Sequence, residues 1–118
     1  MRLFLNADTD SLSGQIDSSF GRCSYFFIYE TEDESFKFLQ NPHQDIQSSV
    51  GASVAQSAIE LKINAVIAVN LGPRAFKLLK EADIEVYHAT EGTPLRKVIS
   101  QFENNELLPL EDYLPHHG

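Results

Sequence analysis

The feature that most constrains the fold is an unbroken apolar run, Ala-Val-Ile-Ala-Val, at residues 65–69 of a chain of 118 residues. A strand that faces water on one side alternates apolar and polar side chains, so a run without alternation is typical of a strand covered on both faces. Pro73 follows shortly after, at the favoured first position of a helix. A buried strand that leads into a helix predicts a parallel sheet between layers of helices.

Changes of pattern along the chain predict the other elements. The aromatic stretch at residues 22–30 and the alternating residues 36–40 are typical of an antiparallel hairpin. Helical spacing of apolar residues begins at Gly51, and Thr93 is placed to cap a helix over residues 94–102. We therefore expect a single α/β domain with a mixed five-stranded sheet, helices on both faces and the order β-β-β-α-β-α-β-α. Its strands are expected at residues 2–7, 22–30, 36–40, 65–69 and 84–87.

Composition argues against several classes of protein. Seventeen acidic and nine basic residues give a net charge of −8, which is the wrong sign for a surface that binds nucleic acid or an anionic membrane. No apolar run approaches the ~20 residues that span a bilayer. The amino terminus turns polar at Asn6, too soon for a signal peptide. Together with the single cysteine, Cys23, which cannot form an intrachain disulfide, these features predict a cytoplasmic protein.

Three polar segments are expected at the carboxyl edge of the parallel strands: residues 8–21, 70–73 and 88–92. In open α/β sheets the ligand crevice lies at this edge. Backbone N–H groups at the start of a helix favour anions, and helices are expected to begin near this edge at Gly51, Pro73 and Thr93. The pattern predicts a site for a small anionic ligand.

Two arginines accompany these turns. Arg22 follows Gly21, and Arg74 lies in the first turn of its helix, where a cation opposes the helix dipole. A guanidinium pairs well with carboxylate or phosphate oxygens; a salt bridge or a solvated side chain is the alternative for both residues. Gly72 and Gly92 are explained by turn geometry. If they contribute to a site, they do so by allowing the backbone to approach the ligand closely.

Three side chains are candidate ligands of a metal or an iron–sulfur centre: Cys23, His43 and His88. A thiolate is a soft ligand suited to such a centre, but a cysteine at the start of a strand also packs as a small hydrophobe. His43 lies in a polar loop and His88 closes a strand, so solvation or a bond to a turn carbonyl is the alternative for each. For the terminal pair His116 and His117, a frayed end is favoured over weak metal binding.

No catalytic motif is present. The sequence has no Gly-x-Ser-x-Gly elbow, P-loop or GxGxxG pattern. Asp8, Asp10 and Asp17 gather in one loop, where carboxylates can bind Mg²⁺ or act as acid and base, but a solvated loop is the favoured interpretation. A nuclease of the ribonuclease H type needs carboxylates within its strands, and residues 2–7 supply none. We expect a protein without enzymatic activity, with a metal-dependent hydrolase as a disfavoured alternative.

Four short patterns occur in a characteristic order along the chain. They are Ser18-Ser19-Phe20-Gly21-Arg22-Cys23 before an aromatic strand, Asn41-Pro42 after the hairpin, the strand at residues 65–68 running into Leu71-Gly72-Pro73-Arg74-Ala75-Phe76, and Val86-Tyr87 followed by Gly92-Thr93. Together they resemble the dinitrogenase iron-molybdenum cofactor biosynthesis family, which includes NifX, NafY and the carboxyl-terminal domain of NifB-type proteins. The resemblance predicts a cofactor-binding domain at residues 1–103 and a carboxyl-terminal extension at residues 104–118.

The resemblance implies a ribonuclease-H-like fold and a carrier that hands an iron–sulfur or iron–molybdenum-type cofactor, or its precursor, to an assembly or acceptor protein. Many family members have a histidine where this chain has Ser19. This departure keeps open an alternative, a metal-free binding or regulatory module for a small anionic ligand or a protein partner. The expected cofactor site comprises Ser19, Phe20, Gly21, Arg22, Cys23, Gly72, Arg74, Gly92 and Thr93, with Cys23, His43 and His88 as expected metal ligands.

Overall fold

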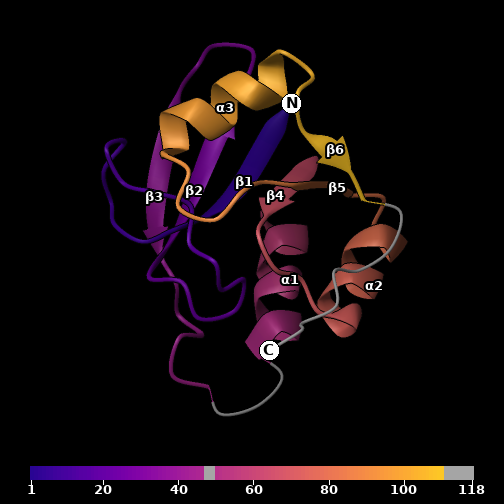
Figure 1. Cartoon of the computed structure of the whole chain (residues 1–118). Coiled ribbons are helices and arrows are strands. Elements are labelled where there is room, and N and C mark those ends of the chain that lie inside the picture. Colours follow the sequence, from indigo (N-terminus) through magenta and orange to yellow (C-terminus); the bar gives the residue numbers. More distant parts are fainter. Residues whose placement is uncertain (47–49, 111–118) are drawn as a thin grey trace.

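Six strands form one mixed sheet in the order β3-β2-β1-β4-β5-β6 in the computed structural model, which describes residues 1–46 and 50–110. Strands β1, β4 and β5 are parallel, whereas β2, β3 and β6 run antiparallel to their neighbours. Figure 1 shows α1 and α2 side by side and α3 crossing the sheet apart from them. The elements are β1 Arg2–Ala7, β2 Tyr25–Glu30, β3 Phe36–Gln40, α1 Val50–Glu60, β4 Ala65–Ala68, α2 Pro73–Glu81, β5 Glu85–His88, α3 Leu95–Glu103 and β6 Leu108–Pro109.

The mixed sheet and the order of its first eight elements confirm the α/β prediction, but the expected number of five strands is wrong. The sixth strand, β6, pairs with the edge of β5, and the N–H of Leu110 donates to the carbonyl of Val86 at 2.8 Å. A two-residue strand that contains a proline has no alternation to reveal it. Residues 111–118 of the expected extension, with His116 and His117, lie outside the described residues. The domain boundary at residue 103 and the ribonuclease-H-like label stay predictions.

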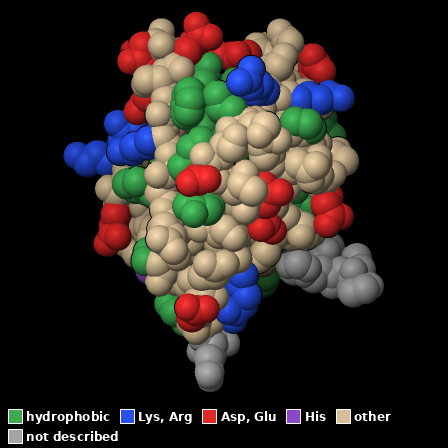
Figure 2. Space-filling view, turned by 90° about the vertical axis from the view of Figure 1, so that its left-hand side faces the viewer, with side chains coloured by type: hydrophobic (Ala, Val, Ile, Leu, Met, Phe, Trp, Pro, Cys, Tyr) green, Lys and Arg blue, Asp and Glu red, His purple; other side chains and the backbone are tan. Residues whose placement is uncertain are grey.

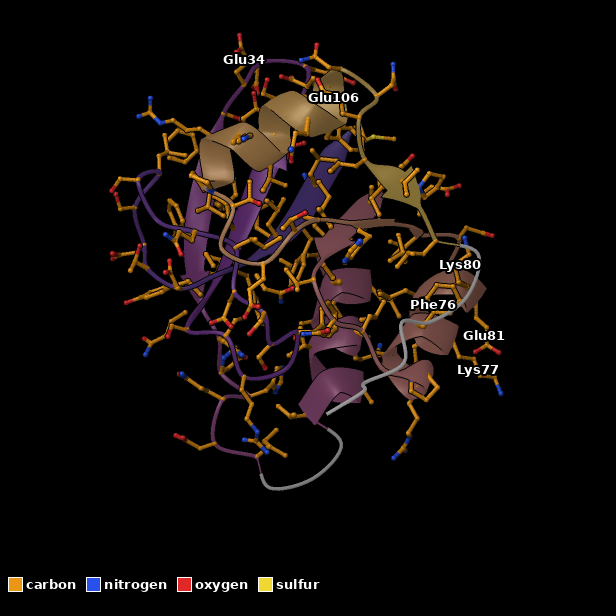
Figure 3. The ribbon with its side chains drawn as sticks, viewed as in Figure 1. Glu34, Phe76, Lys77, Lys80, Glu81 and Glu106 are labelled. Carbon is orange, nitrogen blue, oxygen red and sulfur yellow. The ribbon has the colours of Figure 1, made fainter. Side chains whose placement is uncertain are left out.

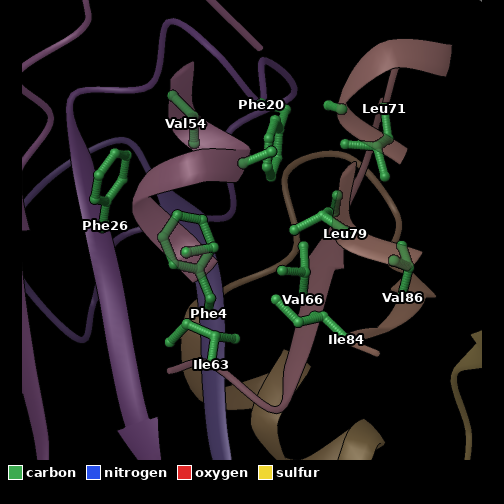
Figure 4. Close-up of a cluster of buried hydrophobic side chains, with 14 of the residues drawn as sticks. Phe4, Phe20, Phe26, Val54, Ile63, Val66, Leu71, Leu79, Ile84 and Val86 are labelled. Atoms are coloured by element: carbon green, nitrogen blue, oxygen red, sulfur yellow. The ribbon is translucent and has the colours of Figure 1, made fainter. Parts of the chain in front are cut away.

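The wholly buried strand β4 explains why this sheet carries helices on both faces. Successive residues of a strand point to opposite faces. Val66 of β4 and Phe4 of β1 belong to the core cluster that includes α1 and α2, which Figure 4 shows in part. Ile67 of β4 and Leu5 of β1 belong to the cluster that includes α3. The prediction of a strand covered on both faces, made from the apolar run, is therefore confirmed.

Helix α2 shows how local sequence sets the orientation of these helices. Phe76 and Leu79 are buried against the sheet, whereas Lys77 and Glu81 are exposed (Figure 3). Pro73 occupies the first turn of α2, as predicted. In the described residues no helix has the length and apolar character needed to cross a membrane.

The expected cap of α3 is wrong. Pro94, rather than Thr93, is the residue before the helix, and the helix begins at Leu95. The hydroxyl of Thr93 instead donates to the carbonyl of Thr90 at 2.7 Å. The side chain thus closes the turn that precedes the helix, a role that serine and threonine also favour.

Removing the ring of Phe4 tests the core described here. Phe4 is fully buried and its ring centroid lies 4.8 Å from that of Phe26. We expect Phe4→Ala to lower the free energy of unfolding by about 3–5 kcal/mol, because the substitution leaves a cavity. Leu108→Ala is the control, since Leu108 is 72% exposed, and it should change stability by no more than ~0.5 kcal/mol. Urea unfolding measures both, and equal losses would contradict the assignment of the core.

Candidate functional site

A cavity of about 510 Å³ opens at the carboxyl edge of β1 and β4. Its walls are the loop at residues 18–22, the first residues of α1 at 50–52, and Asn70 with residues 72–75 leading into α2. The position follows from the topology, because loops that leave the carboxyl ends of parallel strands form the crevice of an open α/β sheet. The predicted crevice is therefore present, between two of the three expected segments.

Three asparagine side chains hold the loop that forms one wall of the cavity. Asn6 at the end of β1 is fully buried, Asn41 is 3% exposed, and Asn70 follows β4. A buried carbonyl without a partner costs about 1–3 kcal/mol, so these donors fix the path of the loop. Their side-chain N–H groups donate to loop carbonyls: Asn70 to Ser18 at 3.0 Å, Asn6 to Phe20 at 3.0 Å, and Asn41 to Gly21 and Cys23 at 2.9 Å each.

Sequence reasoning missed these three asparagines as functional residues. Asn6 and Asn70 looked like ordinary polar residues at the ends of apolar stretches, and Asn41 like part of a turn before Pro42. For two of them, the position relative to the predicted strands could have indicated a role at the site. Asn6 lies near the end of one strand predicted to be parallel and Asn70 follows another, so both belong at the carboxyl edge of the sheet, beside the long loop.

Gly21 brings the loop into contact with the start of α1. A Cβ atom at Gly21 would lie 2.6 Å from Cγ1 of Val50 and 3.0 Å from the backbone nitrogen of Gly51. Only glycine permits this approach without displacement of the helix. The contact fixes the distance between the loop and the first turn of α1, where backbone N–H groups without helical partners gather.

The electrostatic character of the cavity is cationic. Both α1 and α2 begin at its wall, and neither has an acidic residue in its first turn. Among the described lining residues the charged side chains are Arg22 and Arg74. Arg22 is anchored from both ends, because its backbone N–H donates to Oγ of Ser19 at 2.9 Å and its guanidinium to the carbonyl of Gln44 at 2.9 Å. Helix N-termini and guanidinium groups together favour an anionic ligand.

Six of the nine predicted cofactor-binding residues line the cavity. Gly92 and Thr93 do not, because α3 packs on the opposite face of the sheet from α1 and α2. The carbonyl of Thr93 accepts a hydrogen bond from the N–H of Ile16 at 2.9 Å, which joins α3 to the long loop. The start of α3 thus supports the loop from behind and is no part of the cavity wall. The six lining residues are Ser19, Phe20, Gly21, Arg22, Gly72 and Arg74.

Cys23 lies in the core beneath the loop. It is fully buried, and burial raises the pKa of its thiol from 9.0 to about 11. The side-chain amide of Asn6 donates to Sγ at 3.4 Å, and the nearby charge of Asp17 raises the pKa further. Because metal ligands of this type are thiolates, a neutral buried thiol is poorly suited to that role in this conformation.

The structure does not bring the expected metal ligands together. His43 lies on the loop before α1, with Nε2 2.8 Å from Oγ of Ser57, whereas His88 pairs with Leu108 at the far side of the sheet. The described part of the chain contains no group of three or more His, Cys, Asp or Glu residues placed to hold a metal ion. The aspartates of the long loop, Asp8, Asp10 and Asp17, therefore form no such group either. Asp8 accepts a hydrogen bond from the backbone of the loop itself.

Comparison with known proteins identifies the family. The sequence profile described as dinitrogenase iron-molybdenum cofactor matches residues 1–105. The chain belongs to this family. The resemblance expected from the four short patterns is therefore confirmed, and this member of the dinitrogenase iron-molybdenum cofactor family is also 31% identical over 114 residues to an uncharacterised protein of Methanocaldococcus jannaschii. That match covers 94% of this chain and 92% of the relative.

Two solved structures resemble this family member over almost their whole length. The apo form of the orange protein from Desulfovibrio gigas matches with a TM-score of 0.92 and 23% identity, covering 97% of this chain and 96% of the other. A putative NifB protein from Thermotoga matches with a TM-score of 0.82 and 29% identity, covering 98% of each chain. Both share the fold described above.

A pair of glycine substitutions tests the contact between the loop and α1. Gly21→Ala should lower the free energy of unfolding by about 1–3 kcal/mol, because the new methyl group overlaps Val50 and the helix backbone. Gly72→Ala is the matched control within the same cavity wall, since a Cβ there meets no described atom within 4 Å. Its effect should not exceed ~0.5 kcal/mol. Urea unfolding of both variants decides, and equal effects would show that Gly21 is not constrained by α1.

The raised pKa of Cys23 predicts a pH dependence of stability. Above the ordinary pKa of 9.0 the unfolded chain loses its thiol proton, while the folded chain keeps it up to about pH 11. Unfolding therefore releases a proton in this range, and the free energy of unfolding falls as the pH rises, by roughly 2–3 kcal/mol over the whole range. Urea unfolding between pH 8 and pH 11 should show this extra fall in the natural protein relative to Cys23→Ala. If the free energies of unfolding of the natural protein and of Cys23→Ala changed in parallel with pH, the thiol would be accessible to water.

Proposed function

We propose that this protein carries an anionic iron–sulfur or iron–molybdenum-type cofactor, or its precursor, in the cavity between α1 and α2 and hands it to an assembly or acceptor protein. We further propose that it does so without catalysing a reaction. The observation that carries the proposal is the lining of the cavity, with two helix N-termini and two arginines. Membership of the dinitrogenase iron-molybdenum cofactor family supports the same cargo.

The residues present fit one mode of binding better than another. A volume of about 510 Å³ is within the range of ligand sites, roughly 300–1,000 Å³. Backbone N–H groups and the guanidinium groups of Arg22 and Arg74 suit an anion that is held without bonds from side chains to metal. Ligation by Cys23 would require exposure and deprotonation of a thiol with a pKa of about 11. A cargo held by hydrogen bonds and charge can also be released without breaking metal–protein bonds, as a carrier requires.

One specific observation favours a second function. Ser19, which departs from the histidine expected from the family resemblance, accepts a hydrogen bond from the N–H of Arg22 and so stabilises the loop. Since the described residues offer no cluster of metal ligands, the same cavity suits a small anionic metabolite. The alternative is therefore a metal-free binding or regulatory module that uses the same arginines.

Uptake of cofactor by matched variants distinguishes these possibilities. Protein purified without oxygen is titrated with a reconstituted iron–sulfur cluster and, separately, with isolated iron–molybdenum cofactor, and binding is followed by absorbance and metal analysis. We expect saturable uptake that Arg22→Gln combined with Arg74→Gln weakens at least ~10-fold, because charge-assisted hydrogen bonds contribute about 1.5–3 kcal/mol each. Cys23→Ala should bind as the natural protein does. Arg96→Gln, far from the cavity on α3, is the control for charge.

Two results would contradict the proposal in different ways. Loss of uptake in Cys23→Ala with unchanged uptake in the arginine variant would indicate thiolate ligation. Absence of uptake by folded protein would leave the family and fold standing and would favour the metal-free module.

A further inference from the structure

The face of the sheet that carries α3 is incompletely covered. Strands are spaced ~4.8 Å apart and a helix with its side chains is ~10 Å wide, so one helix covers about two strands. Two helices share the opposite face, whereas α3 is the one helix on this face among the described residues. Where α3 does not cover this face, β2 and β3 carry large aromatic side chains. These are Phe27, Tyr29, Phe36 and Phe38, whose rings contact one another with centroid distances of 4.9–6.2 Å.

A groove of about 310 Å³ lies between three of these rings, Phe27, Tyr29 and Phe36, and α3. Phe27 and Tyr29 of β2 form its buried floor, and Ile99 of α3 is on the opposite wall. Phe36 is 47% exposed in the groove, an unusual exposure for a ring in contact with the core. Figure 2 faces the β3 edge of the molecule, where hydrophobic side chains reach the surface below a group of acidic ones.

The rim of this groove is acidic. Glu34 from the β2–β3 turn and Glu103 from the end of α3 line it, with Arg96 as the basic residue of the wall. Figure 3 shows Glu34 and Glu106 at this same end of the molecule. Burial raises the pKa of Tyr29, and the charges of Glu103 and Glu34 raise it further, which reports a negative potential at the floor of the groove.

We propose that this groove, which we call the aromatic groove, docks a segment of a partner protein that inserts an aliphatic or aromatic side chain onto Phe36, with lysine or arginine residues on either side. The apolar floor supplies an anchoring pocket, as expected for the centre of an interface. The acidic rim selects for basic flanks and speeds association. A second copy of this chain fits poorly, because each copy carries a net charge of −8 and would bring an acidic rim of its own.

The aromatic groove and the cavity are on different faces of the sheet. The groove borders α3, whereas the cavity lies at the starts of α1 and α2. A bound partner therefore leaves the cavity open. Docking requires the groove alone, whereas its use in delivery of a cargo rests on the proposed function.

A peptide library tests the docking directly. Fluorescein-labelled hexapeptides carry lysine or arginine at both ends and each aliphatic or aromatic residue at the two central positions, and binding is measured by fluorescence anisotropy. We expect saturable binding of a subset, with NMR amide shifts centred on Phe36 and Glu103. Phe36→Ser, and Glu34→Gln combined with Glu103→Gln, should each weaken that binding at least fivefold. Glu81→Gln on the exposed face of α2 is the matched control and should have no effect.

Three outcomes would overturn the proposal. The first is no saturable binding by any library member, and the second is equal binding of peptides whose central residues are serine, which indicates charge alone. The third is a concentration-dependent dimer in sedimentation experiments that Phe36→Ser abolishes, which indicates a second copy as the occupant. Uptake of cofactor by Phe36→Ser should be normal in every case, so failure of the groove is distinguishable from failure of the carrier function.

Discussion

The hydrogen bonds from three asparagine amides to the loop at residues 18–23 are the interaction on which the site depends. They tie a segment without regular structure to the ends of β1, β3 and β4, and this segment forms one wall of the cavity. The orientation of Asn6 is set by this role, since a rotated amide would direct its oxygen at the carbonyl of Phe20. Among the described residues the buried Oδ1 of Asn6 has no hydrogen-bond partner.

The distribution of charge fits the two partners proposed above, an anionic cargo and a basic protein segment. The chain is acidic overall, yet the described charged residues that line the cavity are arginines, while the aromatic groove is rimmed by Glu34 and Glu103. An acidic surface around a cationic cavity restricts anions to one place. The proposed basic segment would bind at the other end of the molecule. A single domain of this size can in this way separate the recognition of a cargo from the recognition of a protein.

The sequence predicted the parts that depend on local pattern and failed where the outcome depends on packing. The apolar run of β4 and the helix start at Pro73 were predictable, and they place the cavity at the correct edge of the sheet. The face on which α3 packs is set by the whole sheet, so Gly92 and Thr93 could not be separated from the cavity. Cys23 is buried within the core cluster and contacts the amides of Asn6 and Asn41, which are distant in sequence. Strand β6 could not be predicted, because its two residues show no alternation of apolar and polar side chains.

The location of the cofactor in a crystal of the loaded protein is the most direct measurement, because anomalous scattering from its metal atoms gives their positions without reference to any model of binding. Our interpretation predicts metal atoms inside the cavity, next to the first turns of α1 and α2 and within reach of Arg22 and Arg74, with no bond to Cys23. Metal atoms bonded to Cys23, or located at His43 or His88, would contradict it.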